Sequence, residues 1–346
     1  MILTGGEDEP LLHGGDIGAA RRLFPGAPEP FIDLSTGINP NPYPLPRFSP
    51  VLFARLPEPA AAEALAQAAA HAYGAPTAAH IVPAPGTQIL LPLVAGLARP
   101  GRAAILTPTY PELCRAATLA GHAVKTVHRI EDCSDATLVI VGNPNNPDGR
   151  LVPQPTLLTL AQDLRRRSGV LVIDEAFMDV EAPGASLAAD VACGNIVVLR
   201  SFGKFFGLAG VRLGFAITAP AFAARLSALL GPWAVSGPAL AVGTKALTDT
   251  DWIGRTRDRL EKAASKLDTI LNASGLHIIG GTSLFRLVET PAANALFRHL
   301  GRAGIFVRAF PEHASWLRFG LPSGAREWRR LDAAMVSFRN NSQHGN

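Results

Sequence analysis

Short apolar runs, separated by polar loops and helical patterns, recur through the middle of the chain. Each run is continuously apolar instead of alternating with polar residues, which is typical of strands that helices cover on both faces of a mostly parallel sheet. A Pro/Asn-rich loop and a helical pattern near residues 155–168 separate the third run from the fourth. The pattern therefore predicts an α/β fold. The runs lie at residues 103–107, 124–127, 137–142, 169–174, 195–201 and 212–218.

Helical patterns lie on either side of this region. Residues 58–74 are rich in alanine and predict a helix that ends at Gly74, and residues 251–274 predict a long amphipathic helix. The chain then alternates strand and helix patterns, which indicates a smaller α+β domain: strands at 282–289, 305–310 and 316–321, helices at 293–304 and at the C-terminal end.

The chain start is different, because residues 1–57 are rich in Pro and Gly and predict an irregular arm. We therefore expect three parts. Residues 1–57 form the arm and part of the small domain, residues 58–250 form the large domain, and residues 251–340 form the linking helix and the C-terminal small domain.

The composition and net charge indicate which kinds of ligand the protein is expected to bind. Apolar residues make up 48% of the chain and charged residues 17%, which favours a large core over disorder. The formal net charge is +4, yet the arginines are scattered apart from residues 165–167, so nucleic-acid binding is not expected. Small anionic substrates suit this charge better.

The cysteines, the N-terminal residues and the length of the apolar stretches predict where in the cell the protein is located. The three cysteines are widely spaced and odd in number, so we expect neither disulfides nor a metal site, and a reducing compartment. The N-terminus lacks the basic start and apolar core of a signal peptide. Apolar stretches stay below about 18 residues, so we expect a cytoplasmic protein that does not span a membrane.

Residues 201–215, SFGKFFGLAGVRLGF, place one lysine among apolar and flexible neighbours. Lys204 has two interpretations. It is either an exposed loop lysine beside a buried pair of phenylalanines, or a lysine whose depressed pKa makes it a nucleophile able to form a Schiff base. The rest of the chain has to decide between them.

Other short motifs follow the predicted strands. Gly86, Thr87 and Gln88 begin a helix, where free N–H groups and the helix dipole attract a phosphate. Tyr110 follows a strand and serves either to stack on a flat ring or to form a turn. Asn146, in GNPNNPDG, either donates to a phenolate oxygen or belongs to an ordinary Pro/Asn turn.

Three further residues complete the set. Asp174 ends an apolar strand, where a carboxylate is costly unless it has a partner such as a pyridinium nitrogen. Ser201 and Arg212 supply a hydroxyl and a guanidinium on either side of Lys204, and Arg212 suits a phosphate through charge-assisted bonds.

In this order the motifs resemble the fold-type I aminotransferase superfamily, which uses pyridoxal 5'-phosphate. The resemblance implies that Lys204 binds the coenzyme covalently, that Asp174 pairs with the ring nitrogen, and that Tyr110 stacks on the ring. Those three are the expected catalytic residues. It also implies a large domain with a mostly parallel, mixed sheet between helices. The remaining residues expected to bind the coenzyme are Gly86, Thr87, Gln88, Asn146, Ser201 and Arg212.

The segments LLHGGDIGAARRLF and FIDLSTGINPNPYP are similar to the threonine-phosphate decarboxylases of cobalamin biosynthesis, relatives of the histidinol-phosphate aminotransferases. This resemblance implies a homodimer that decarboxylates O-phospho-L-threonine to (R)-1-amino-2-propanol O-2-phosphate. Two arginines and a histidine suit a substrate with a carboxylate and a phosphate. The expected substrate-binding residues are His13, Gly14, Gly37, Asn146, Arg308 and Arg318.

Other interpretations stay open at this stage. His13 also fits an exposed arm residue, and Arg308 a surface salt bridge. A histidinol-phosphate-type aminotransferase and a non-catalytic coenzyme binder are the two rival functions. Three positions depart from the family pattern, where relatives often have hydroxyl-bearing residues: Leu56, Phe177 and Gly203.

Overall fold

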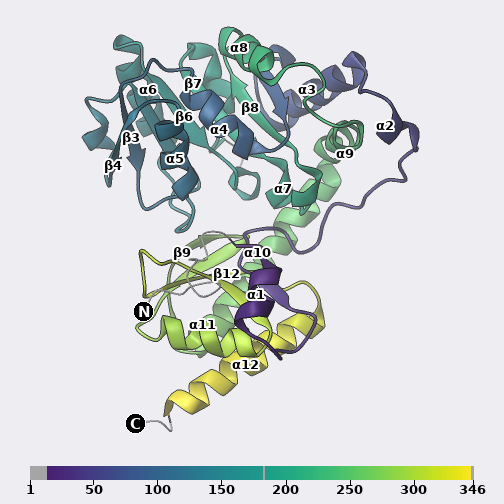
Figure 1. The fold of residues 1–346 in the computed structure, drawn as a ribbon, viewed down its shortest axis with the longest axis vertical. Coiled ribbons are helices and arrows are strands. Elements are labelled where there is room, and N and C mark those ends of the chain that lie inside the picture. Colours follow the sequence, from purple (N-terminus) through teal and green to yellow (C-terminus); the bar gives the residue numbers. More distant parts are fainter. Residues whose placement is uncertain (1–13, 182–183, 344–346) are drawn as a thin grey trace. The chain divides into compact units, whose positions relative to one another are not determined.

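The computed structural model describes residues 14–181 and 184–343 and contains two compact units (Figure 1). The larger unit comprises residues 42–254, and the smaller combines the chain before residue 42 with the chain after residue 254. Helix α10 (Thr250–Ala273) continues across the second division. The three parts expected from the sequence stay a prediction. None of the helices within the described residues has the length and hydrophobicity that crossing a membrane requires.

The larger unit is built on a seven-stranded sheet in the order β2-β8-β7-β6-β5-β3-β4. Strand β8 runs antiparallel to its neighbours β2 and β7, and the other pairs are parallel. The prediction of a mostly parallel, mixed sheet is therefore confirmed. The strands are β2 (Ile81–Ala84), β3 (Arg102–Leu106), β4 (Ala123–Val127), β5 (Leu138–Gly142), β6 (Val170–Asp174), β7 (Ile196–Ser201) and β8 (Gly214–Thr218).

Helices cover this sheet and bury most of its strands on both faces (Figure 1). One face packs against α4, α5 and α8. On the other face, residues such as Val139, Leu171 and Val198 are also fully buried, which explains the continuous apolar runs. The prediction is wrong for edge strand β4, whose residues are mostly exposed. The helices are α2 (Val51–Ala54), α3 (Pro59–Tyr73), α4 (Thr87–Ala95), α5 (Pro111–Leu119), α6 (Gln154–Arg166), α7 (Phe202–Phe205), α8 (Pro220–Leu230) and α9 (Gly237–Thr248).

The ends of helix α3 follow from its sequence. Pro59 occupies the first turn, where its missing N–H costs nothing, and Gly74 adopts the left-handed conformation with φ 72° just after the last turn. The predicted helix at residues 58–74 is confirmed. Strand β2 was not predicted, because it has four residues and contains Pro83; it pairs with β8 alone, at the edge where proline is tolerated.

The smaller unit contains a five-stranded sheet in the order β1-β11-β12-β10-β9. Its α+β character is confirmed. Strand β1 pairs in parallel with β11, and residues 17–23 and 51–54 are helical, so the expectation of an irregular arm is wrong over these three segments. The elements are α1 (Ile17–Leu23), β1 (Ile32–Leu34), β9 (His277–Thr282), β10 (Phe285–Glu289), α11 (Ala293–Arg302), β11 (Ile305–Ala309), β12 (Trp316–Gly320) and α12 (Ala325–Gln343).

Candidate active site

The carboxyl ends of the parallel strands meet at one edge of the larger sheet, and β8, which runs the opposite way, begins there. Gly214 at the start of β8 lies opposite Ala84 at the end of β2 and Ser201 at the end of β7. Asp174 at the end of β6 lies opposite Gly142 at the end of β5. Sites in α/β sheets form at this edge. It brings together the candidates of this unit: Gly86, Thr87, Gln88, Tyr110, Asn146, Asp174, Ser201, Lys204 and Arg212.

Arg212 packs on the amino-terminal end of helix α4. Gly86 precedes that helix with φ 88°, and a Cβ there would lie 2.5 Å from Nη2 of Arg212. A Cβ on Gly214 would lie 2.7 Å from the backbone nitrogen of Thr87. No side chain caps the start of α4. The uncapped N–H groups and the guanidinium therefore form a cradle suited to a phosphate.

Lys204 lies in the short helix α7 and is half-buried, so it is not the fully exposed loop lysine of the alternative interpretation. Its Nζ lies 5.8 Å from the centre of the Phe177 ring. The neighbouring Phe206 stacks on Phe202 with ring centres 4.4 Å apart and on Trp252 at 5.6 Å. This aromatic packing fixes the helix that carries the lysine.

Gly203 has a steric explanation. A Cβ at this position would lie 2.7 Å from the Cα of Ala209, a backbone atom that cannot move aside cheaply. Serine or threonine, which relatives often have here, does not fit this local backbone. The missing hydroxyl is thus linked to the close approach of the turn that leads to Arg212.

Asp174 ends strand β6 in a half-buried position. Burial raises the pKa of its carboxyl to about 6, although a hydrogen bond from the Ala176 N–H at 3.2 Å and the charge of Lys204 act in the opposite direction. An ionised carboxylate at this place is therefore costly until a cation such as a pyridinium pairs with it.

We expect the coenzyme-free Asp174→Asn variant to be more stable than wild type at pH 8, by up to about 3 kcal/mol. The folded-state pKa of Asp174 lies above its ordinary value, so its folded form binds the proton more tightly than its unfolded form. Wild-type stability should therefore fall, relative to the variant, as pH rises from about 4 to about 6. Urea unfolding of both coenzyme-free proteins across pH measures this difference; a gap that does not change with pH would contradict it.

Tyr110 and Gln88 interact directly. The Tyr110 hydroxyl donates to Oε1 of Gln88 at 3.1 Å, and Nε2 of Gln88 donates to Glu112 at 2.8 Å. Gln88 is exposed on the first turn of α4 and orients the tyrosine ring. Asn146 is half-buried in the loop after β5, and Ser201 is buried at the end of β7.

The smaller unit holds the substrate-binding candidates that the structure describes. Arg318 on β12 is 7% exposed, and its Nη2 donates to the backbone oxygen of Ser35 at 2.9 Å. Gly14 lies against the same residue, since a Cβ on Gly14 would be 2.4 Å from the Ser35 oxygen. Gly37 is buried just after this segment, and His13 lies outside the described residues. The structure thus brings Gly14 and Arg318 together.

Two arginines are directly opposite each other in this sheet. Arg308 on β11 is the register partner of Arg318 on β12. Like charges in this arrangement repel. Burial, followed by the charge of Arg308, lowers the pKa of Arg318 to about 9, although Asp33 acts in the opposite direction. Two arginines side by side on adjacent strands suit a ligand with two anionic groups.

Residues that the sequence interpretation did not single out also belong to these sites. Ser35 accepts a hydrogen bond from the Gly15 N–H and donates to Asp33 at 2.6 Å. Thr109 and Asn145 bind each other across two loops of the larger unit. An Asp two positions before a Ser signals a local turn, but Asn145 carries no signal that separates it from the other asparagines of its loop.

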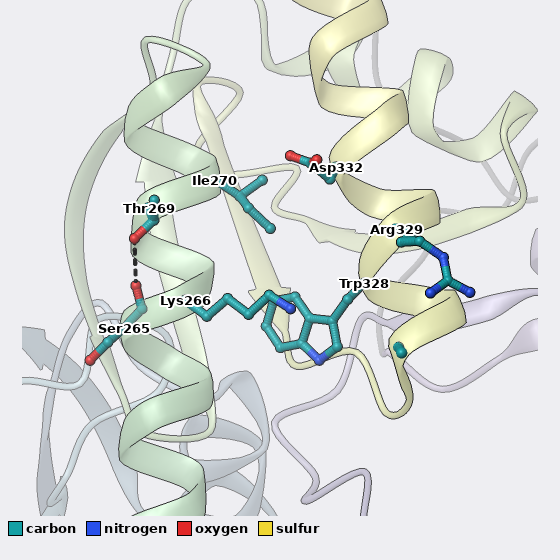
Figure 2. A pocket seen from close by; sticks show the side chains of 8 residues that line it. Ser265, Lys266, Thr269, Ile270, Trp328, Arg329 and Asp332 are labelled. Carbon is teal, nitrogen blue, oxygen red and sulfur yellow. Dashed lines mark hydrogen bonds between the residues drawn. The ribbon is translucent and has the colours of Figure 1, made fainter.

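A hollow of about 600 Å³ lies elsewhere, between α10 and α12 of the smaller unit (Figure 2). Figure 2 shows Lys266 extending along Trp328, with the Lys266 Nζ 4.6 Å from the ring centre. None of the candidate residues lines this hollow, so it is a groove between surface helices and not the candidate site. Its lining residues are Ser265, Lys266, Thr269, Ile270, Ala325, Trp328, Arg329 and Asp332.

Comparison with known proteins agrees with this geometry. The family model "Aminotransferase class I and II" matches residues 50–329. A threonine-phosphate decarboxylase from Sinorhizobium sp. is 43% identical over 94% of this chain and 98% of its own. The Pseudomonas aeruginosa threonine-phosphate decarboxylase is 40% identical over 95% and 98%. The solved histidinol-phosphate aminotransferase of Clostridium acetobutylicum shares the fold, with TM-score 0.78, 22% identity, and coverage of 90% of this chain and 99% of its own.

The residues at the edge of the larger sheet fit the family's coenzyme, pyridoxal 5'-phosphate. The cradle formed by Gly86, Thr87 and Arg212 suits its phosphate, and the costly carboxyl of Asp174 suits its ring nitrogen. The prediction of the type I fold for pyridoxal-phosphate-dependent enzymes is confirmed. The chain belongs to the class I and II aminotransferase family and, within it, to the group of the threonine-phosphate decarboxylases.

Proposed function

We propose that this protein decarboxylates O-phospho-L-threonine to (R)-1-amino-2-propanol O-2-phosphate in cobalamin biosynthesis. The relatives at 43% and 40% identity, which match this chain over 94% and 95% of its length, support the reaction. The observation that carries the substrate class is the Arg308–Arg318 pair, because a phospho-amino acid brings a carboxylate and a phosphate.

The arginines would bind and orient the substrate. Arg318 is buried and anchored by Ser35, so its guanidinium presents a rigid fork to one anionic group. Arg308 lies beside it and suits the second group. Binding an anion here also relieves the repulsion between the two cations.

The residues of the larger unit would carry out the bond cleavage. Lys204, Asp174, Tyr110 and the phosphate cradle would hold the coenzyme, which supplies an electron sink when bound. The Cα–carboxylate bond breaks, carbon dioxide leaves, and the electron pair remains on Cα. The Nζ of Lys204 then donates a proton to Cα and regains one from solvent.

Two incubations test this proposal against its rivals. The purified protein, supplied with pyridoxal 5'-phosphate, receives O-phospho-L-threonine without any keto acid. We expect stoichiometric carbon dioxide and aminopropanol phosphate. Steady formation of glutamate from histidinol phosphate and 2-oxoglutarate would instead support the aminotransferase, which the sequence interpretation kept as its alternative. Bound coenzyme without turnover of either substrate would support a non-catalytic binder.

We further propose a homodimer that works in the cytoplasm. Leu45, Val51, Phe53 and Leu56 are between 51% and 69% exposed in the single chain, and an apolar group of this kind suits an interface with a second copy. Cys114, Cys133 and Cys193 are free thiols, which suits a reducing compartment. Leu56 has no hydroxyl, so a tyrosine contact to the partner's coenzyme, often present in relatives, is not expected here.

A further inference from the structure

We propose that the hydrogen bond between Thr109 and Asn145 is a positioning device for the coenzyme ring. This inference rests on the proposed coenzyme site. Thr109 directly precedes Tyr110 in the loop after β3, and Asn145 directly precedes Asn146 in the loop after β5. The two loops therefore carry Tyr110, which is expected to stack on the ring, and Asn146, which is expected to donate to the phenolate oxygen of the ring.

Asn145 is fully buried and links the loops through its side chain. Its Oδ1 accepts from the Thr109 hydroxyl at 2.7 Å, and its Nδ2 donates to the Pro108 carbonyl at 2.7 Å. The same Nδ2 donates to Oδ1 of Asp148 at 2.7 Å, which also accepts from the Arg150 N–H at 3.1 Å. The amide thus bonds to the two residues before Tyr110 in one loop and to a residue just after Asn146 in the other.

The orientation of the amide follows from its partners. The Pro108 carbonyl and the Asp148 carboxylate only accept hydrogen bonds, so the NH₂ group must face them. The oxygen then faces Thr109, whose hydroxyl is its donor. A buried amide oxygen without a hydrogen-bond donor is costly in free energy. We therefore expect that loss of the Thr109 hydroxyl shifts the loop that contains it.

Two substitutions at one position separate positioning from packing. Thr109→Val keeps the shape and removes the donor, whereas Thr109→Ser keeps the donor and removes a methyl group. We expect Thr109→Val to raise the coenzyme dissociation constant about tenfold and to change the circular dichroism band of the bound coenzyme. We expect Thr109→Ser to stay within about twofold of wild type. Coenzyme titration without substrate measures both, so the result does not depend on decarboxylation.

A second pair of variants tests the other end of the linkage. Asn145→Asp keeps an acceptor for Thr109, loses both donations and places a carboxylate against Asp148. Adding Asp148→Asn restores a donor between the two positions and is expected to recover at least part of the lost coenzyme affinity. If Thr109→Val is recovered only as aggregate, the comparison of Asn145→Asp with the double variant still tests whether the linkage positions the coenzyme.

Two results would overturn the inference. One is a Thr109→Val protein that melts at a lower temperature without coenzyme yet binds the coenzyme with wild-type affinity and an unchanged dichroism band, since that outcome indicates packing alone. The other is a double variant at residues 145 and 148 that binds no better than Asn145→Asp.

Discussion

Replacing Lys204 by alanine is expected to abolish both the yellow colour of the holoenzyme and its turnover. Alanine has no amine to bond to the coenzyme aldehyde and none to return a proton to the substrate Cα. Because one residue serves both roles, we expect the rate to fall by roughly four orders of magnitude or more. The absorbance of the purified protein and the release of carbon dioxide from O-phospho-L-threonine measure the two effects separately.

Lys245→Ala is the matched control. Lys245 is exposed on α9 in the same unit, so the same substitution should leave colour and turnover unchanged. Borohydride reduction of wild type followed by peptide mapping should find the coenzyme on the peptide that contains Lys204. Covalently held coenzyme in Lys204→Ala would refute the assignment, whatever the residual activity.

The sequence predicted which residues meet at the carboxyl ends of the larger sheet, because the positions of the strands can be recognised from short segments of the chain. The apolar runs that end at Asp174 and Ser201 define buried strands, and parallel strands bring their carboxyl ends to one edge. The polar residues after those strands are then neighbours without further assumptions. Placing Arg212 required more information than the position of one strand. Arg212 precedes β8, so it lies at the same edge only because β8 runs antiparallel to β7.

Other features depended on contacts that no local pattern encodes. The three residues of β1 became a strand by pairing with β11, about 270 residues away in the chain. Asn145 and Asn146 look alike in the sequence, yet Asn145 is fully buried between two loops. Gly203 was read as a lost hydroxyl, whereas the structure relates it to the close approach of Ala209.

The pairing of Arg308 with Arg318 is a further feature that the sequence alone did not predict. An arginine within an apolar strand suggested that Arg318 has a special role, but spacing does not give strand register. The pairing of Arg308 with Arg318 across β11 and β12 is what turns two separate residues into one anion site. Two guanidinium groups on neighbouring strands suit a substrate that carries two anionic groups.

The second large effect is expected for Arg318→Lys, which keeps the positive charge. Lysine has no planar fork and cannot bond an anionic group in a bidentate manner while also donating to the Ser35 carbonyl. We expect kcat/KM for O-phospho-L-threonine to fall by roughly 10²- to 10³-fold, mostly through KM. Steady-state kinetics measures the change, and titration of the coenzyme should show unaltered affinity.

Arg286→Lys in the same sheet separates this effect from sheet damage. Arg286 on β10 binds Asp268 through two hydrogen bonds at 2.5 and 3.0 Å, so its anionic partner belongs to the protein. Its replacement should lower stability slightly and leave kcat/KM within about twofold, since an ion pair of this exposure contributes little. If both lysine variants lost activity equally, or if Arg318→Lys kept a wild-type KM, Arg318 would not be the substrate anchor. A selective loss at Arg318 would instead indicate that its guanidinium binds an anionic group of the substrate.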